Sequence, residues 1–179
     1  MRTLRRRLSA EAPDAGALAA DVLPLERFAG LAAAAVYYAQ GAELDPTPLA
    51  ERLAAVGVTV ALPVALSREG HLQFRRWRLG EALAPDVTGV PSPPAAAAAV
   101  TPQLVVAPLL AFDRRGGRLG QGGGHYDRTL SNLRAAGGVF VLGLAYAGQE
   151  LEAIPMEPHD QRLDAILTED GYIAVEQDR

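Results

Sequence analysis

Four short apolar runs, separated by helical patterns, constrain the fold of this chain more than any other feature. The runs are residues 33–38, 58–62, 104–108 and 139–145. Short, continuous apolar runs of this kind are typical of strands that are buried on both faces of a sheet. Helical patterns occupy residues 15–23, 49–56 and 126–136. Alternation of strands and helices predicts a mostly parallel sheet covered by helices on both faces.

The remaining segments complete this prediction. Residues 71–77 alternate loosely in polarity and predict a partly exposed strand, whereas Pro63 is expected to break the strand before it. The Pro- and Ala-rich stretch 80–102 predicts a long connection without a regular helix or central strand. Residues 165–175 predict a terminal strand pair around Gly171. A chain of 179 residues is expected to form one domain, residues 1–179.

Two residue types are missing, and their absence excludes several kinds of chemistry. The chain contains no cysteine, so disulfides, thiolate nucleophiles, iron–sulfur clusters and cysteine–zinc sites are excluded. All 17 residues counted as Lys or Arg are Arg. The absence of lysine excludes the P-loop and protein-kinase motifs, Schiff-base enzymes and pyridoxal phosphate chemistry.

Charge and hydropathy indicate a soluble protein. The formal net charge of −4 argues against a general nucleic-acid-binding protein, which would normally be basic. The most apolar early stretch, residues 31–39, is much shorter than the ~20 residues of a membrane span. Acidic residues and Pro13 follow the basic start where a signal peptide would need an apolar run. We therefore expect a cytoplasmic protein without nucleic-acid or membrane partners.

The glycine-rich segment before the third helix is the strongest sign of a binding site. Six of the nine residues from Gly116 to Gly124 are glycine. A glycine-rich loop that opens into a helix directs several N–H groups and the positive end of the helix dipole at one point, which favours phosphate. Arg118 can add a bidentate anion contact. The dinucleotide-binding fingerprint is absent, because His125 stands where it requires Gly or Ala.

The glycines of this segment and the carboxylate that follows them each also have a purely structural interpretation. The glycines can form a flexible connector that binds nothing. Asp127 lies in the first helical turn, where a carboxylate is favourable through the helix dipole alone. The segment by itself does not decide between these interpretations and a phosphate and metal site.

The segment 111–128 resembles the signature of the 5-formyltetrahydrofolate cyclo-ligases, also called 5,10-methenyltetrahydrofolate synthetases. The matching runs are Ala111-Phe112-Asp113, Arg118-Leu119-Gly120 and Gly124-His125-Tyr126-Asp127-Arg128. Further stretches agree in order and spacing, namely Glu43-Leu44-Asp45, Leu62-Pro63, residues 89–93, Ile154-Pro155, residues 157–160 and Leu163-Asp164. The resemblance spans nearly the whole chain, from about Leu4 to Gly171.

The resemblance implies an enzyme in which ATP phosphorylates the formyl oxygen of 5-formyltetrahydrofolate and the folate N10 closes the new ring. It implies a three-layer α/β/α fold with a mostly parallel, Rossmann-like sheet of the sugar-phosphate isomerase and CoA-transferase type. The implied ATP loop consists of Arg118, Leu119, Gly120, Gln121, Gly122, Gly123, Gly124, His125 and Tyr126. Arg118 and Tyr126 would act in catalysis, Tyr38 and Glu43 would bind the folate, and Asp127 and Asp160 would hold Mg²⁺.

Several departures from the family pattern keep a second interpretation open. Gln121 replaces a residue that is often basic or aromatic, Gly123 replaces a frequent lysine, and His125 replaces an aromatic residue. The family also opens with a basic helix that contacts ATP phosphates, and here it is expected to be truncated. Either an upstream segment supplies those cations, or Arg2, Arg5, Arg6 and Arg7 fold back over the loop.

The alternative function is a catalytically weakened relative that binds folate or a nucleotide. A third possible function, that of a sugar-phosphate isomerase or acyltransferase, is supported by fold analogy alone. The enzyme is favoured because Glu43, Arg118, Tyr126, Asp127 and Asp160 are all retained. We expect it to act as a monomer.

Overall fold

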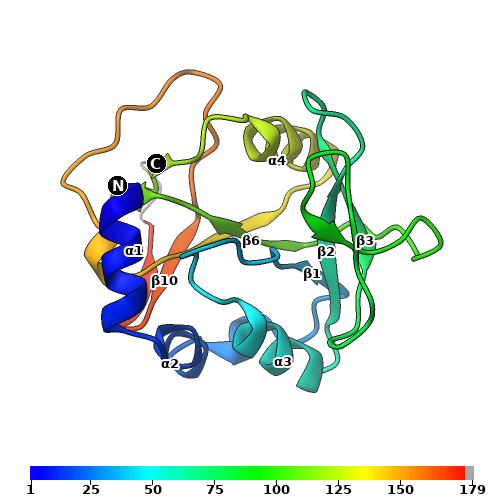
Figure 1. Ribbon diagram of the computed structural model, residues 1–179, viewed down its shortest axis with the longest axis horizontal. Coiled ribbons are helices and arrows are strands. Elements are labelled where there is room, and N and C mark those ends of the chain that lie inside the picture. Colours follow the sequence, from blue (N-terminus) through cyan, green and yellow to red (C-terminus); the bar gives the residue numbers. More distant parts are fainter. Residues whose placement is uncertain (176–179) are drawn as a thin grey trace.

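A computed structural model describes residues 1–175, and its centre is one seven-stranded sheet (Figure 1). The strands are β1 (Ala33–Ala35), β2 (Thr59–Ala65), β3 (Leu72–Arg76), β6 (Leu104–Pro108), β9 (Phe140–Leu144), β10 (Ala165–Thr168) and β11 (Gly171–Ala174). Their spatial order is β11-β10-β9-β6-β1-β2-β3. All pairings are parallel except those of β3 and β11 at the two edges. The predicted mostly parallel sheet is confirmed.

Helices cover both faces of this sheet (Figure 1). The helices are α1 (Arg2–Glu11), α2 (Ala15–Asp21), α3 (Thr47–Ala55) and α4 (His125–Ala136), with 3-10 turns at Leu25–Arg27 and Ala147–Gln149. In the view of Figure 1, α2 and α3 lie below the sheet and α4 lies above it. The fold therefore has the three layers, α/β/α, that the sequence predicts.

Alternation along the strands divides the apolar core between the two faces. Leu104, Val106 and Leu142 belong to the cluster that contains α2 and α3. Val105 and Val141 belong to the cluster on the α4 side. Because neighbouring strand residues face opposite sides, strands covered on both faces must be apolar at almost every position. This requirement explains the continuous apolar runs in the sequence.

The expectation that Pro63 breaks the second strand is wrong, because β2 continues through Pro63 to Ala65. Proline lacks the N–H that a strand normally donates to its neighbour. On one side of β2, β1 is paired only as far as Ala61. On the other side Pro63 lies opposite Phe74, whose carbonyl accepts a hydrogen bond from the backbone N–H of Val100. No neighbouring strand therefore requires a donor at Pro63.

Other boundaries differ from the prediction by a few residues. Strand β1 ends at Ala35, although Val36 and Tyr37 remain buried beyond it. Helix α3 begins two residues early, at Thr47, and Pro48 occupies its first turn, where its missing N–H costs no helical bond. The connection 80–102 contains only a two-residue strand pair, β4 (Ala84–Pro85) with β5 (Pro91–Ser92).

A small hairpin carries the start of the glycine-rich segment. Strand β7 (Ala111–Phe112) pairs with β8 (Arg118–Leu119), and Asp113 begins the turn between them. The buried Asp113 carboxylate accepts hydrogen bonds from the backbone N–H groups of Arg115, Gly117 and Ile154. Burial opposes ionisation of Asp113, but these three bonds outweigh it and lower its pKa. Asp113 thus fixes the segment after residue 150 against the hairpin.

Candidate functional site

A cavity of about 700 Å³ lies at the carboxyl ends of the parallel strands. Ligands bind in this position in most open α/β sheets. Its walls are formed by residues 37–43 after β1, the end of β2, the start of β3 at Leu72, residues 86–90, residues 108–109 at the end of β6, and residues 155–160. The glycine-rich loop, from Arg118 to Asp127, completes the enclosure.

The loop between β8 and α4 takes a conformation that depends on glycine. Gly122 has φ +92° and Gly124 has φ +64°, a region that other residues rarely adopt. A Cβ atom on Gly124 would also lie 2.5 Å from Nη1 of Arg128. Gly124 is the N-cap of α4, and no side chain of residues 1–175 caps this helix. The first-turn N–H groups therefore remain available to an anion in the cavity.

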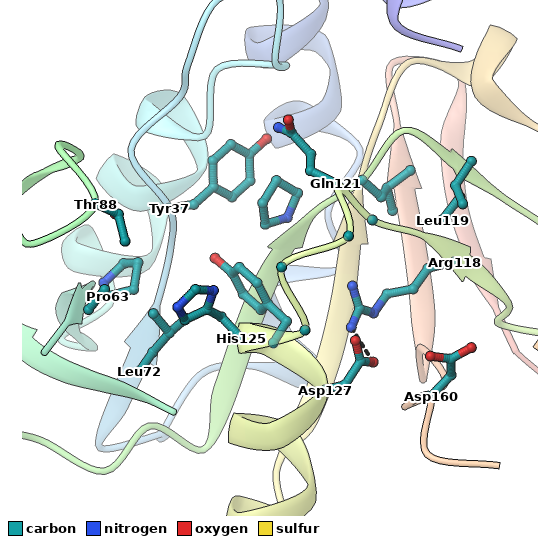
Figure 2. A pocket seen from close by; sticks show the side chains of 18 of the residues that line it. Tyr37, Pro63, Leu72, Thr88, Arg118, Leu119, Gln121, His125, Asp127 and Asp160 are labelled. Carbon is teal, nitrogen blue, oxygen red and sulfur yellow. Dashed lines mark hydrogen bonds and ion pairs between the residues drawn. The ribbon is translucent and has the colours of Figure 1, made fainter. Parts of the chain in front are cut away.

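Arg118 and Asp127 form an ion pair in the wall of the cavity (Figure 2). Arg118 Nη2 donates to Asp127 Oδ1 at 2.5 Å, and the backbone N–H of Gln161 donates to the same oxygen at 3.0 Å. Only 5% of the Arg118 side chain is exposed. Its Nε is buried and has no hydrogen-bond partner among residues 1–175. Protein groups therefore do not satisfy this guanidinium fully, as expected of a group that also serves a ligand.

Tyr126 packs beside Arg118 at the start of α4. The Arg118 guanidinium carbon lies 5.9 Å from the centre of the Tyr126 ring, within the range of a cation–π contact. Burial raises the pKa of Tyr126 far above its usual value, and Glu43 adds to this effect while Arg118 opposes it. The phenol is therefore neutral near pH 7 and can donate a hydrogen bond.

The two carboxylates predicted to hold Mg²⁺ both line the cavity, and Figure 2 shows Asp160 on the same side as Arg118 and Asp127. Asp160 accepts a hydrogen bond from the backbone N–H of Glu157 at 2.8 Å. No group of three or more His, Cys, Asp or Glu side chains within residues 1–175 is arranged to hold a metal ion. Two carboxylates nevertheless fit Mg²⁺, which usually keeps several waters and binds substrate phosphates.

Two adjacent tyrosines that line the cavity have different environments. Tyr38 was predicted to contact substrate, and it lines the cavity while 42% exposed. Tyr37 also lines the cavity, is buried, and donates its hydroxyl hydrogen to the carbonyl of Leu44. Burial raises the pKa of Tyr37 well above its usual value, with Glu43 nearby adding to the effect. Tyr37 therefore stays neutral and supports the turn that carries Glu43.

Every residue predicted for the site lies on this one cavity: Tyr38, Glu43, residues 118–126, Asp127 and Asp160. Sequence reasoning assigned no role to several other lining residues, among them Tyr37, Gln40, Leu72, Asp86, Thr88, Met156 and His159. Some of these had a usable signal, because residues 86–90 lie in a long loop, and long loops are often functional. Others, such as Leu72, look like ordinary strand residues in the sequence.

Helix α1 lies beside the site, as expected if the basic N-terminal segment folds back over the glycine-rich loop. The Arg5 side chain is buried and its Nη1 donates to the carbonyl of Leu109 at 3.2 Å. Arg2, Arg5, Arg6 and Gln121 together line a second, smaller cavity of about 290 Å³. Three of the four arginines of α1 thus adjoin the glycine-rich loop, whereas Arg7 is exposed and pairs with Glu11 in its own helix.

No helix within residues 1–175 is long and apolar enough to span a membrane. This finding agrees with the short apolar runs of the sequence.

Comparison with known proteins identifies relatives over nearly the whole chain. The profile of the 5-formyltetrahydrofolate cyclo-ligase family matches residues 1–169. The chain is 34% identical to the 5-formyltetrahydrofolate cyclo-ligase of Mycolicibacterium smegmatis, over 74% of this chain and 71% of that protein. It is 36% identical to the cyclo-ligase of Escherichia coli K12, over 75% of this chain and 76% of that protein.

Solved structures agree with the sequence comparison. The 5,10-methenyltetrahydrofolate synthetase of Aquifex aeolicus superimposes with a TM-score of 0.73 and 25% identity, covering 100% of this chain and 87% of that one. The synthetase from Mycoplasma pneumoniae, at 21% identity, shares the fold with a TM-score of 0.67. With the profile match over residues 1–169, these relatives place the chain in the 5-formyltetrahydrofolate cyclo-ligase family.

Proposed function

We propose that the cavity around Arg118 performs the reaction of this family, the ATP-dependent cyclisation of 5-formyltetrahydrofolate to 5,10-methenyltetrahydrofolate. The observation that carries this assignment is the buried Arg118 guanidinium, which lies beside an uncapped helix terminus and is not fully satisfied by protein groups. A cation and free N–H groups at one point form a site for a transferring phosphoryl group. ATP is the co-substrate of this ligase.

In the proposed arrangement the phosphates of ATP lie over the loop from Arg118 to Tyr126. The backbone N–H groups of the loop and of the first turn of α4 bind phosphate oxygens, and Arg118 balances the charge that develops on the γ-phosphoryl group. The neutral phenol of Tyr126 donates a hydrogen bond beside it. Tyr38 and Glu43 hold the folate in the same cavity, and Asp127 and Asp160 would hold Mg²⁺.

The chemistry divides into two steps. In the first, the formyl oxygen on N5 attacks the γ-phosphorus, a new O–P bond forms, and ADP leaves. In the second, N10 attacks the activated formyl carbon and loses its proton, and the C–O bond breaks as phosphate departs with the formyl oxygen. A double bond between that carbon and N5 completes the methenyl product. Mg²⁺, when bound, supplies positive charge to the phosphate oxygens.

Both steps depend on how the chain orders its two substrates. The glycine-rich loop and the turn at Glu43 line the same cavity and touch through Gln121, so the γ-phosphoryl group and the formyl oxygen can meet inside it. Orientation of two reactants in this way can supply about 7–11 kcal/mol of the barrier reduction.

A direct assay tests this function. We expect purified protein incubated with 5-formyltetrahydrofolate, ATP and Mg²⁺ to produce the methenyl chromophore, and we expect omission of either ATP or the divalent ion to abolish it. Absorbance of the product and release of phosphate, measured together, should rise in a one-to-one ratio. Folded protein that binds folate but turns over no ATP would instead support the catalytically weakened binding protein.

A further inference from the structure

Three segments that are far apart in the sequence meet at the carboxylate of Glu43. Its Oε1 accepts hydrogen bonds from Gln121 Nε2 at 3.0 Å and from Arg5 Nη1 at 3.4 Å. Its Oε2 accepts one from the backbone N–H of Gln40 at 3.0 Å. Only 7% of the Glu43 side chain is exposed. The predicted folate-binding carboxylate therefore contacts a helix, its own turn and the glycine-rich loop in the cavity wall.

Two of these donors differ in how firmly they are held. Arg5 is buried and also donates to the carbonyl of Leu109, just beyond the end of β6, so it forms a fixed anchor. Gln121 is exposed and stands between Gly120 and Gly122 in the glycine-rich loop. A Cβ atom added to Gly122 would meet no atom within 4 Å, so this part of the loop has open space around it. The position of the Gln121 amide therefore follows that of the loop.

We infer that Gln121 is a positioning residue that couples the nucleotide loop to the folate-binding carboxylate. This inference rests on the proposed function. Phosphates bound to the backbone of residues 120–124 would order the loop and hold the Gln121 amide against Glu43. A carboxylate has about four acceptor positions, and three donors are already present, so a folate N–H can bind without displacing Gln121.

The expected consequence is positive cooperativity between the two substrates. Whichever ligand binds first orders the Gln121–Glu43 contact, and the second ligand then loses less conformational entropy on binding. Such coupling must be reciprocal, so ATP and folate strengthen each other's binding by the same factor.

Calorimetric titration tests the coupling without turnover. We expect 5-formyltetrahydrofolate to bind about fivefold or more tightly when β,γ-imido-ATP and Mg²⁺ are present, at the lower end of the usual coupling range. Gln121→Met keeps the length of the side chain and removes its donor, so this ratio should fall close to one. Gln121→Lys restores a donor and should restore most of the ratio. Thermal melts of both variants confirm that the chain is folded.

Gln40→Ala is the matched control, because Gln40 binds Glu43 through its backbone N–H, which this substitution keeps. Its coupling ratio should remain that of the wild type, whatever happens to the individual affinities. An unchanged ratio in Gln121→Met, or a wild-type ratio of one, overturns the inference. Because no turnover is involved, the coupling and the cyclo-ligase activity can fail independently.

Discussion

Replacing Arg118 by Met should lower the turnover number by about 100-fold or more at saturating ATP, with a smaller effect on the Michaelis constant for folate. The guanidinium is the buried cation that faces the proposed position of the γ-phosphoryl group. Removing one group that stabilises developing charge in a dry site typically costs about 100–1,000-fold in rate. Steady-state kinetics with each substrate varied in turn measure the effect.

A second ion pair on α4, the helix that carries Asp127, provides a control for the loss of the Arg118–Asp127 pair. Arg134 Nη2 donates to Asp164 Oδ2 at 3.1 Å, near the other end of α4, and neither residue lines the cavity. Arg134→Met should destabilise the fold without a comparable loss of turnover. Arg118→Lys keeps the charge and loses the planar fork, so it should be intermediate. Equal turnover in Arg118→Met and Arg134→Met would remove Arg118 from the mechanism.

Asp127→Asn should raise the Mg²⁺ concentration needed for half-maximal rate by at least about tenfold and lower turnover at saturating ATP. The substitution keeps the shape of the side chain and an oxygen that accepts from Arg118 and from the Gln161 backbone. It removes the negative charge that a hard cation requires. Initial rates across a Mg²⁺ titration measure this requirement.

Asp164 is a close match for this test, because one of its oxygens also accepts from an arginine and from a backbone N–H, that of Val141. Asp164→Asn should leave the Mg²⁺ requirement unchanged. If Asp127 only pairs with Arg118 and complements the dipole of α4, Asp127→Asn should lower the free energy of unfolding, the dipole alone contributing about 0.3–1 kcal/mol, and should cost little activity. A lower melting temperature with an unchanged Mg²⁺ requirement would establish that structural role.

Much of the fold could be predicted from local pattern because strands covered on both faces must be apolar throughout. This reasoning located β6 and β9 closely. It failed at Pro63, because the cost of a proline in a strand depends on whether neighbouring strands need its N–H. Here neither neighbour needs the N–H, because β1 ends opposite Ala61 and the carbonyl of Phe74 accepts from Val100 instead. A single sequence does not show either fact.

For the candidate site, sequence reasoning named part of the cavity lining but none of the contacts within it. Glycine spacing and family resemblance indicated the loop, Glu43 and both carboxylates. Neither could show that Arg118 pairs with Asp127, or that Gln121 reaches Glu43, a residue 78 positions away in the sequence. Such contacts depend on how the parallel strands bring loops together. Tyr37 was missed for a similar reason, since local sequence did not show which of two adjacent tyrosines is buried.

If ATP activates the formyl oxygen inside this cavity, that oxygen must leave in the released phosphate, and isotope transfer measures this. 5-Formyltetrahydrofolate labelled with ¹⁸O in the formyl group is incubated with the protein, ATP and Mg²⁺, and the released phosphate is analysed by mass spectrometry. We expect one ¹⁸O atom in each phosphate formed with the methenyl product. Methenyl product accompanied by unlabelled phosphate would contradict it.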